Sequence, residues 1–336
     1  MPKGRMSEII TEGVAEHPAV QAWLRVQSNF AEPGSLELLQ RRRNSTVYRF
    51  RDVRPDGTRV IAKRCRKETA RIERTIYEEL LPLARMSALR CYGFLEEPEG
   101  DYVWVFLEDA EGVPYSPQLP QHRALAGCWL AEAQLTAVRA DFKSCLPDRD
   151  LDHYLRLLRV CRTMLQRHLD AGALPVEDAT VFRNIAMHLD ELESLWAELV
   201  KICEVMPRTL VHGDFVIKNL RVRERPKGPA LLVFDWEFAG WGVPAADLAQ
   251  FIDRAASPDL SLYRSMLNRE HFDLDLRDLQ AVAACGNLLR LVDQMSWATA
   301  GHEFVLPAQL VKATALLQSY EPSILGALSA FQRSYA

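Results

Sequence analysis

The 336-residue sequence lacks the apolar segments that are typical of membrane and secreted proteins. It has no stretch of about 18 consecutive apolar residues, the length that a membrane-spanning helix needs. The first residues, MPKGRMSEIITEG, contain no apolar segment of the kind found in signal peptides. The sequence therefore predicts a cytoplasmic protein that does not bind membranes.

Paired cysteines and an excess of charge of one sign are also lacking. The seven cysteines are scattered singly, and none forms a Cys-x-x-Cys pair, so we expect reduced thiols rather than disulfides or a zinc site. The 41 Lys and Arg residues face 45 Asp and Glu residues, a net charge of -4. Because this balance gives no overall field for binding phosphate backbones, we expect no nucleic-acid partner.

What is present is the composition of an ordinary globular protein. Hydrophobic residues make up 48% and charged residues 26%, which is too apolar and too balanced for a disordered or coiled-coil chain. At roughly 150 residues per domain, the length predicts two domains or two lobes. No internal repeat is visible, so the organisation is inferred from the order of strand-like and helix-like segments.

Short strand-like segments dominate the first third of the chain. The order of elements there is β-β-β-α-β-β. The helix prediction rests on Ile72, Ile76, Leu80 and Leu83, which recur at helical spacing beside a charged face. The predicted strands cover 35–43, 46–53, 58–64, 89–95 and 102–107, and the predicted helix covers 68–85.

Helical periodicity prevails from about residue 118 onward. The predicted helices cover 121–140, 151–169, 178–205, 275–298 and 307–334. Two short β-rich segments, 209–211 and 231–234, interrupt them. The sequence therefore predicts an α+β fold of two lobes, a small antiparallel β N-lobe over 1–112 and a larger, mostly helical C-lobe over 113–336.

The region of the two short β-rich segments also contains polar residues whose types and spacing indicate a catalytic site. His212-Gly213-Asp214 is followed five positions after the aspartate by Asn219, and Asp235 ends an apolar strand. Phosphoryl transfer needs a carboxylate to orient or deprotonate the attacking hydroxyl, and oxygen ligands for Mg²⁺. The spacing His-x-Asp-x-x-x-x-Asn, followed by a strand-terminal Asp, is the arrangement of protein kinases.

These motifs, together with Asp235-Trp236-Glu237 and the segment GVPAADLA at 242–249, resemble the aminoglycoside phosphotransferase and choline kinase superfamily, which is related to protein kinases. The order of the weaker elements, from 35 to 331, resembles that superfamily as well. The resemblance implies a kinase-like fold that uses ATP and Mg²⁺ to phosphorylate a hydroxyl group of a small molecule.

The resemblance also implies roles for the residues of the motifs. Asp214 would be the catalytic base or the group that orients the hydroxyl, and His212 would brace the catalytic loop. Asn219 and Asp235 would bind the Mg²⁺ that bridges the nucleotide phosphates. Asp247 would hold the catalytic loop from the next helix.

Further roles follow for the nucleotide site. Lys63, on the third strand, would contact the α- and β-phosphates and would be positioned by a glutamate of the following helix. We prefer Glu73 for this partner over Glu78 or Glu79. The segment Glu108-Asp109-Ala110 would be the hinge whose backbone pairs with adenine.

Two features depart from a protein kinase. No Gly-x-Gly-x-x-Gly lies between the first strands, so the segment Arg43-Asn44-Ser45-Thr46 would cover the phosphates with its N–H and hydroxyl groups. No Ala-Pro-Glu segment follows Asp235, which argues against a protein substrate. Lys218, just before Asn219, would neutralise the transferring phosphoryl group.

Other interpretations of these residues and of the function stay open at this stage. Lys63 also fits a solvated strand lysine, Glu73 a helix-surface acid and Asp247 a helix-start residue. The alternatives in function are a nucleotide-binding regulator without turnover, or a protein or lipid kinase.

The acceptor is the least determined part of the prediction. Asp253, Asp293 and Trp297 are candidates for binding a cationic or sugar-like substrate, although ordinary helix-surface acids and a core aromatic explain them better. Aminoglycosides, choline-like amines, amino sugars and homoserine-like amino alcohols all fit. The sequence does not distinguish ATP from GTP as the nucleotide, and it does not determine the oligomeric state.

Overall fold

The computed structural model describes residues 8–27, 31–53, 57–98, 100–172, 174–299 and 307–335. These residues form two compact units. The first contains the described residues up to Pro114 together with Asn219–Phe238, and the second contains Tyr115–Lys218 and the described residues from Ala239 on.

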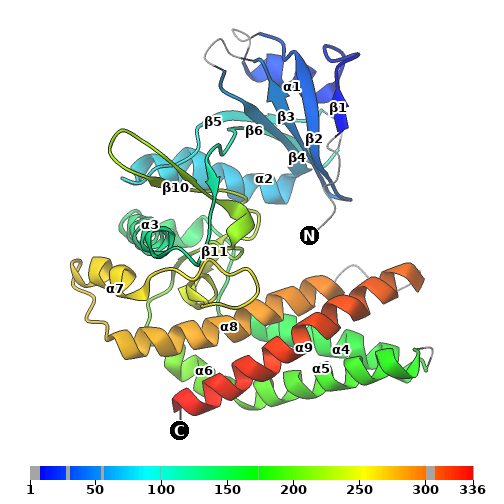
Figure 1. Ribbon diagram of the computed structural model, residues 1–336, viewed down its shortest axis with the longest axis vertical. Helices are drawn as coiled ribbons and strands as arrows, with labels where there is room; N and C mark the ends of the chain where they lie inside the picture. Colours follow the sequence, from blue (N-terminus) through cyan, green and yellow to red (C-terminus); the bar gives the residue numbers. More distant parts are fainter. Residues whose placement is uncertain are drawn as a thin grey trace. The chain divides into compact units, whose positions relative to one another are not determined.

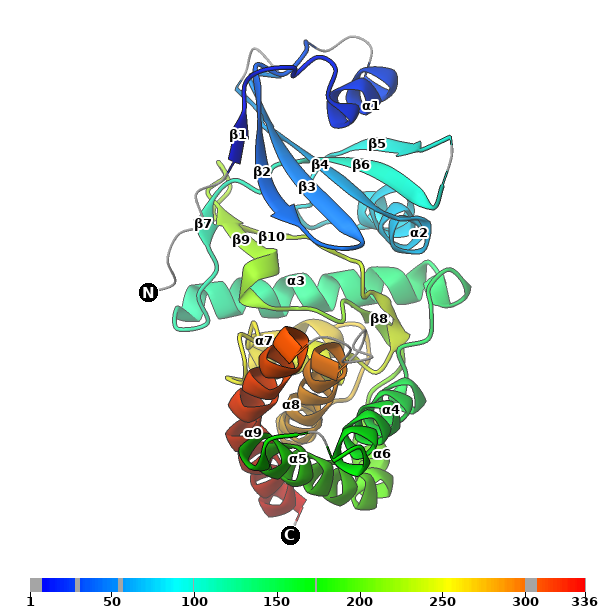
Figure 2. The same cartoon turned by 90° about the vertical axis from the view of Figure 1, so that its right-hand side faces the viewer.

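The first unit is built on an antiparallel sheet with the strand order β1-β2-β3-β4-β6-β5. Helix α1 (Pro18–Val26) lies against one face of this sheet and α2 (Lys67–Arg74) against the other (Figure 2). The sheet strands are β1 (Glu8–Ile10), β2 (Ser35–Arg41), β3 (Ser45–Arg51), β4 (Val60–Arg66), β5 (Cys91–Glu96) and β6 (Tyr102–Glu108).

A smaller sheet completes the first unit. Its order is β10-β9-β7, from β7 (Val113–Pro114), β9 (Leu220–Arg223) and β10 (Ala230–Val233). The pairing of β9 with β7 explains why residues 219–238 pack with the N-terminal part of the chain. The sequence analysis had not predicted β9, because four residues are too few to show a period.

An aromatic cluster between α1 and the sheet forms the core of the first unit. The Trp23 ring lies 6.3, 5.5 and 5.3 Å, centre to centre, from the rings of Phe50, Tyr92 and Phe106. Aromatic side chains of this size bury 150–250 Å² each. Since side chains alternate across a strand, Lys63 on β4 points to the opposite face of the sheet.

The helix that follows β4 changes its geometry along its length, which corrects the prediction of one helix over 68–85. The α-helical part ends at Arg74, a π-helical part covers Thr75–Leu80, and a 3-10 turn covers Leu81–Leu83. Pro82 has no N–H to donate and its ring crowds the preceding turn. The α-helical pattern therefore cannot continue to residue 85.

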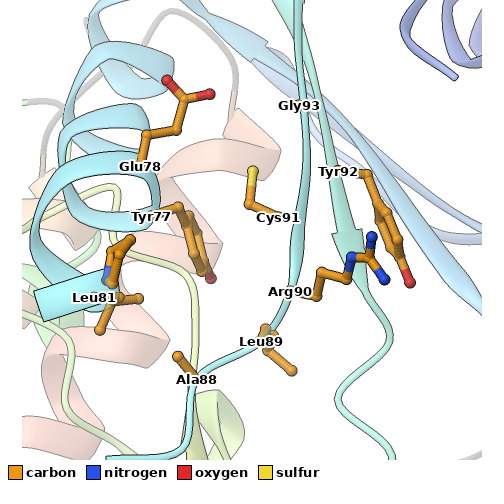
Figure 3. Close-up of a pocket in the computed structure, with 10 residues that line it drawn as sticks. Tyr77, Glu78, Leu81, Ala88, Leu89, Arg90, Cys91, Tyr92 and Gly93 are labelled. Atoms are coloured by element: carbon orange, nitrogen blue, oxygen red, sulfur yellow. The ribbon is translucent and has the colours of Figure 1, made fainter. Parts of the chain in front are cut away.

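A recess of about 460 Å³ lies between this π-helical part and β5, the edge strand of the sheet (Figure 3). Tyr77 and Cys91 face each other across it. Tyr77 is buried, and its hydroxyl has no hydrogen-bond partner among the described residues. The fold therefore retains an unsatisfied hydroxyl one helical turn after Glu73.

We expect Tyr77→Phe to stabilise the protein slightly, by up to ~1 kcal/mol, because it removes an unsatisfied buried hydroxyl and keeps the ring. The free energy of unfolding from urea denaturation tests this. A loss of more than ~1 kcal/mol would mean that the hydroxyl makes a hydrogen bond.

The second unit is mostly helical. Its helices are α3 (Pro120–Arg139), α4 (Leu151–Asp170), α5 (Val176–Ser194), α6 (Trp196–Cys203), α7 (Leu260–Asn268), α8 (Leu276–Thr299) and α9 (Pro307–Tyr335). β8 (Thr209–Val211) pairs with β11 (Gly240–Gly242). The predicted helix over 178–205 is two helices that meet at Leu195, and the sequence analysis missed α7 and its N-cap, Asp259.

Helix α8 lies at the centre of this unit, is buried on almost every side, and has α9 alongside it (Figure 1). It also packs closely on the 3-10 helix Pro244–Leu248 at Gly286. A Cβ atom there would lie 1.8 Å from the Ala245 carbonyl oxygen, so only glycine allows this approach. The contact positions Asp247, which lies in the same 3-10 helix.

The predicted α+β fold, with an antiparallel β N-terminal region and a helical C-terminal region, is confirmed. Among the helices of the described residues, none has both the length and the apolarity that a membrane crossing requires.

Candidate active site

The loop that follows β8 is held in place by one buried carboxylate. Asp247 Oδ2 accepts the His212 N–H at 2.6 Å, and Asp247 Oδ1 accepts the Gly213 N–H at 3.0 Å. His212 Nδ1 in turn accepts the Asp214 N–H at 3.2 Å. Burial raises the pKa of Asp247 to about 7, although both N–H donors lower it.

Asp247→Asn should destabilise the protein by about 1–3 kcal/mol, because an amide nitrogen cannot accept a backbone N–H and leaves one buried donor unsatisfied. Urea denaturation measures the change, and Asp273→Asn, at an exposed position, is the matched control. Equal stability of the two variants would show that Asp247 does not hold the loop.

Asp214 itself is buried, and each of its carboxylate oxygens contacts a cation. Oδ1 accepts a hydrogen bond from Arg290 Nη2 at 2.8 Å, and Oδ2 lies 2.7 Å from Lys218 Nζ. Burial alone would raise the pKa of Asp214, but the charges of Arg290 and Lys218 outweigh it and hold this pKa below its usual value. The carboxylate therefore stays ionised in spite of its burial.

Arg290 is the functional candidate that the sequence analysis missed. It lies on α8, and its guanidinium also donates to the Gly213 carbonyl oxygen at 3.3 Å and lies 5.3 Å from the Trp297 ring centre. The available signal was a charged residue inside the apolar run Leu288-Leu289-Arg290-Leu291-Val292. Since a charge is seldom buried without a partner, that pattern points to a buried acid elsewhere in the chain.

The three acceptor candidates fall into two groups. Asp293 has no exposed surface and contacts Arg149 Nη1 at 3.3 Å, and burial raises its pKa to about 6. It is therefore neither a surface acid nor open to an acceptor in this structure. Asp253 accepts a hydrogen bond from Gln294, and Trp297 is partly exposed beside Arg290.

In the first unit, Lys63 joins two acids. Its Nζ donates to Glu73 Oε1 at 2.8 Å and to Asp235 Oδ1 at 2.7 Å. Burial lowers the pKa of Lys63, but the nearby carboxylates raise it well above its usual value. Of the three glutamates considered, Glu73 makes the contact, whereas Glu78 and Glu79 are exposed.

The β9–β10 ladder brings the two candidate metal ligands together. Leu220 pairs with Val233, and the Phe234 N–H donates to the Asn219 carbonyl oxygen at 3.2 Å. Asp235 follows directly, with a φ of 69°. A non-glycine residue in this left-handed region stores strain, which is common at functional sites.

The charge of this region suits a divalent cation. Glu237, which the sequence analysis quoted without assigning a role, has its pKa raised by burial and by Asp235, whereas Lys63 lowers it. Three carboxylates, those of Glu73, Asp235 and Glu237, thus lie near Lys63, and Arg42 also acts on Glu237. Mg²⁺ prefers one or two carboxylates supplemented by phosphate and water oxygens. The oxygens of Asn219 and Asp235 and the surplus negative charge therefore fit Mg²⁺.

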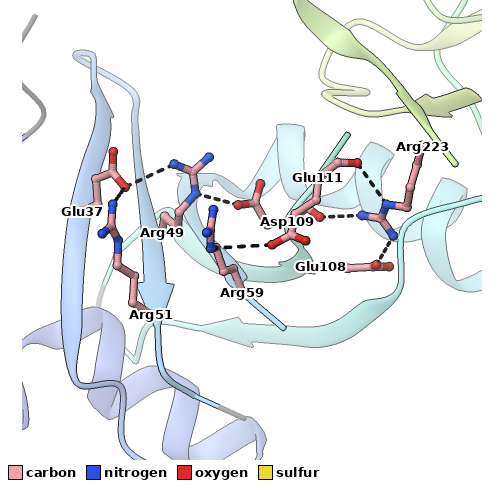
Figure 4. A network of polar contacts seen from close by, with 8 residues as sticks. All are labelled: Glu37, Arg49, Arg51, Arg59, Glu108, Asp109, Glu111 and Arg223. Atoms are coloured by element: carbon pink, nitrogen blue, oxygen red, sulfur yellow. Dashed lines mark hydrogen bonds and ion pairs between the residues drawn. The ribbon is translucent and has the colours of Figure 1, made fainter. Parts of the chain in front are cut away.

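Arginine side chains hold in place the segment after β6 that was predicted to be the hinge (Figure 4). Arg223 of β9 donates to the Glu108 carboxylate and to the carbonyl oxygens of Asp109, at 2.9 Å, and Glu111, at 3.0 Å. Arg49 Nε donates to Asp109 Oδ2 at 2.6 Å. These contacts leave the segment little freedom to move relative to the sheet.

Within this segment, Ala110 offers its backbone to a ligand. The Asp109 N–H donates to the Arg59 carbonyl, and the Glu111 N–H donates to the Asp109 carbonyl at 2.7 Å. No hydrogen bond joins the Ala110 backbone to any other residue that the structure describes. Its N–H and C=O are therefore available for the edge of a base.

The hairpin predicted to cover the phosphates connects β2 and β3. Its turn is closed by the Arg42 N–H, which donates to the Ser45 carbonyl at 2.8 Å. Val47 is the cross-strand partner of Lys63, so Ser45, two residues earlier, lies on the same face of the sheet as the lysine. Asn44 is exposed in the turn.

Comparison with known proteins places these groups in a family. The model of the phosphotransferase enzyme family, APH, matches residues 35–285. The chain belongs to this family. The matched residues include the predicted catalytic, nucleotide-binding and metal-binding residues, but not Arg290 or the acceptor candidates Asp293 and Trp297. No curated protein matches the sequence.

Solved structures of similar fold cover nearly the whole chain. A mutant aminoglycoside 2'-phosphotransferase-IIIa in its GDP complex has a TM-score of 0.64 and 12% identity, over 92% of this chain and 98% of that one. A spectinomycin phosphotransferase with ADP and spectinomycin has a TM-score of 0.59 and 9% identity, over 93% and 98%. Choline kinase from Cryptosporidium parvum Iowa II has a TM-score of 0.56 and 12% identity, over 92% and 94%.

The family match confirms the predicted phosphotransferase family and an enzyme of that family, and the solved structures share its fold. The roles of individual residues, the nucleotide and the acceptor stay predictions.

Proposed function

We propose that the protein transfers the γ-phosphate of ATP, with Mg²⁺, to a hydroxyl group of a small molecule in the cytoplasm. The observation that carries this proposal is the contact of Lys63 with both Glu73 and Asp235. A lysine held by a helix glutamate beside a metal-binding aspartate is the arrangement that phosphoryl transfer requires in kinases.

The first part of the proposal concerns the nucleotide. Lys63 contacts the α- and β-phosphates, and the hairpin with Asn44 and Ser45 covers them with N–H and hydroxyl groups. The hinge from Glu108 to Ala110 takes the adenine, with the Ala110 backbone as the pairing group. In this division of roles, residues 1–112 bind the nucleotide, and 113–336 carry the catalytic loop and the acceptor site.

Asn219 and Asp235 would hold the metal ion. Bound Mg²⁺ would bridge the phosphate oxygens and offset the negative charge that develops during transfer. Asp235 has a second task, since its Oδ1 also positions Lys63. Asp235 thereby connects the metal site to the phosphate-binding lysine.

The transfer step takes place at Asp214. The acceptor oxygen attacks the γ-phosphorus, the bond from that phosphorus to the bridging oxygen breaks, and ADP leaves with the electron pair. The hydroxyl proton passes to an oxygen of Asp214. Because the Arg290 charge lowers its pKa, Asp214 is a weak base that mainly orients the hydroxyl. This role suits the loose transition state of phosphoryl transfer.

The alternatives in function have less support. A regulator that binds nucleotide without turnover would not need Lys63, Asp214, Asn219 and Asp235 together. A protein kinase would carry an activation segment after Asp235, and none is visible in the sequence. For the acceptor we propose an aminoglycoside-, choline- or amino-sugar-like molecule, with Asp253 and Trp297 as its candidate contacts.

Asp214→Asn should lower kcat by ~10²- to 10⁴-fold, the contribution of a positioned acid–base group. Nucleotide binding should not weaken, because Asp214 touches the acceptor and not the metal. Turnover on an identified acceptor and titration calorimetry with Mg-ATP measure the two effects. Full turnover of this variant would refute the role of Asp214.

Asp235→Asn should instead weaken Mg²⁺-dependent nucleotide binding, and higher Mg²⁺ concentrations should recover part of the activity. Calorimetric titration of ATP with and without Mg²⁺ separates the metal from the nucleotide. A variant that binds Mg-ATP like the parent would remove Asp235 from the metal site.

A further inference from the structure

The two cations on Asp214 differ in how firmly they are held. The Arg290 side chain is 6% exposed and has a second anchor in the Gly213 carbonyl oxygen. The Lys218 side chain is 46% exposed and contacts the other oxygen, Oδ2. A buried guanidinium with two partners stays in place, whereas a half-exposed ammonium on a flexible stem exchanges partners at little cost.

This difference decides which oxygen an acceptor can use. A hydroxyl group that is oriented by Asp214 must donate to Oδ1 or to Oδ2. Each carboxylate oxygen can accept two hydrogen bonds, so access decides between them. Oδ1 lies against the Arg290 side chain, which is 6% exposed, whereas Oδ2 faces the more exposed Lys218 side chain. Oδ2 is therefore the oxygen that an acceptor reaches more readily, and Lys218 contacts it in this structure.

Lys218 has a natural second partner next to it in the chain. It directly precedes Asn219, the candidate metal ligand, and Cα atoms of consecutive residues lie ~3.8 Å apart. If Asn219 holds a metal ion together with nucleotide phosphates, those phosphates would lie within reach of the Lys218 side chain. A triphosphate also carries several negative charges against the single charge of Asp214, so it attracts the ammonium more strongly.

We propose that Lys218 changes partner when the nucleotide binds, from Asp214 Oδ2 to the γ-phosphate. Arg290 stays on Oδ1 and keeps the carboxylate in position, so Arg290 is a positioning residue. The vacated Oδ2 then accepts the acceptor hydroxyl. This inference rests on the proposed function and adds a binding order to it: the nucleotide enters first and opens the acceptor site.

The test is the affinity for Mg-AMP-PNP, a non-hydrolysable ATP analogue, measured by calorimetry on the parent, Asp214→Asn, Lys218→Met and the double variant. In the parent background Asp214→Asn should tighten binding about two- to fivefold, because Lys218, whose side chain is half exposed, no longer has to leave a partner. In the Lys218→Met background, Asp214→Asn should give no such gain in affinity. Lys218→Met alone should weaken binding.

Two controls test whether the gain in nucleotide affinity comes from the change in overall charge rather than from Lys218. Lys201→Met removes an exposed lysine of the same unit, and in that background Asp214→Asn should still tighten binding. Mg-ADP lacks the γ-phosphate, so with Mg-ADP the gain should be absent in every background. An equal gain in the parent and Lys218→Met backgrounds would overturn the partner change and leave the proposed function standing. No binding of either nucleotide to the parent would overturn both.

A second measurement needs no substitution at Asp214. In protein labelled with ¹⁵N-lysine, the Lys218 ammonium signal is assigned by its loss in Lys218→Met. Mg-AMP-PNP should shift this signal, and Mg-ADP should leave it near its position in the free protein. A signal that Mg-AMP-PNP does not move would contradict the proposal, whether or not Asp214→Asn folds.

Discussion

Asp214 places a carboxylate almost entirely out of contact with solvent, and a buried charge without partners is too costly for a folded protein to keep. The helical unit meets this constraint with two cations from different parts of the chain, Arg290 from α8 and Lys218 from the loop that follows β8. Much of the unit follows from it. Helix α8 must run through the centre of the unit, and Asp247 must hold the loop so that the carboxylate meets Arg290.

The first unit also contains a buried charge that needs partners, but here the buried charge is positive and its partners are negative. Lys63 is the buried charge there, and Glu73 and Asp235 are its partners. The aromatic core around Trp23 occupies one face of the sheet and leaves the lysine on the other. Residues 219–238 return to this unit through β9 and bring Asp235 to Lys63. In each unit, a paired buried charge thus locates a residue with a proposed role in phosphoryl transfer.

The sequence revealed the parts of the site that are close together along the chain. His212, Asp214 and Asn219 lie within eight residues, so their spacing alone carries the motif. Arg290 could not be assigned, because it lies 76 positions after its partner Asp214 and its place depends on how α8 packs. Helical periodicity also could not show the π-helical part before Pro82, since an apolar spacing of three to four residues does not distinguish a π-helical turn from an α-helical one.

The central claim is that the two sets of groups together phosphorylate a small hydroxylated molecule. The direct measurement is mass spectrometry of a panel of aminoglycosides, choline-like amines, amino sugars and amino alcohols after incubation with the purified protein and Mg-ATP. The account predicts that at least one compound gains a single phosphoryl group, that ADP appears in equal amount, and that Asp214→Asn forms far less product. It would be contradicted if the protein bound Mg-ATP yet phosphorylated no compound, or if Asp214→Asn formed product as fast as the parent.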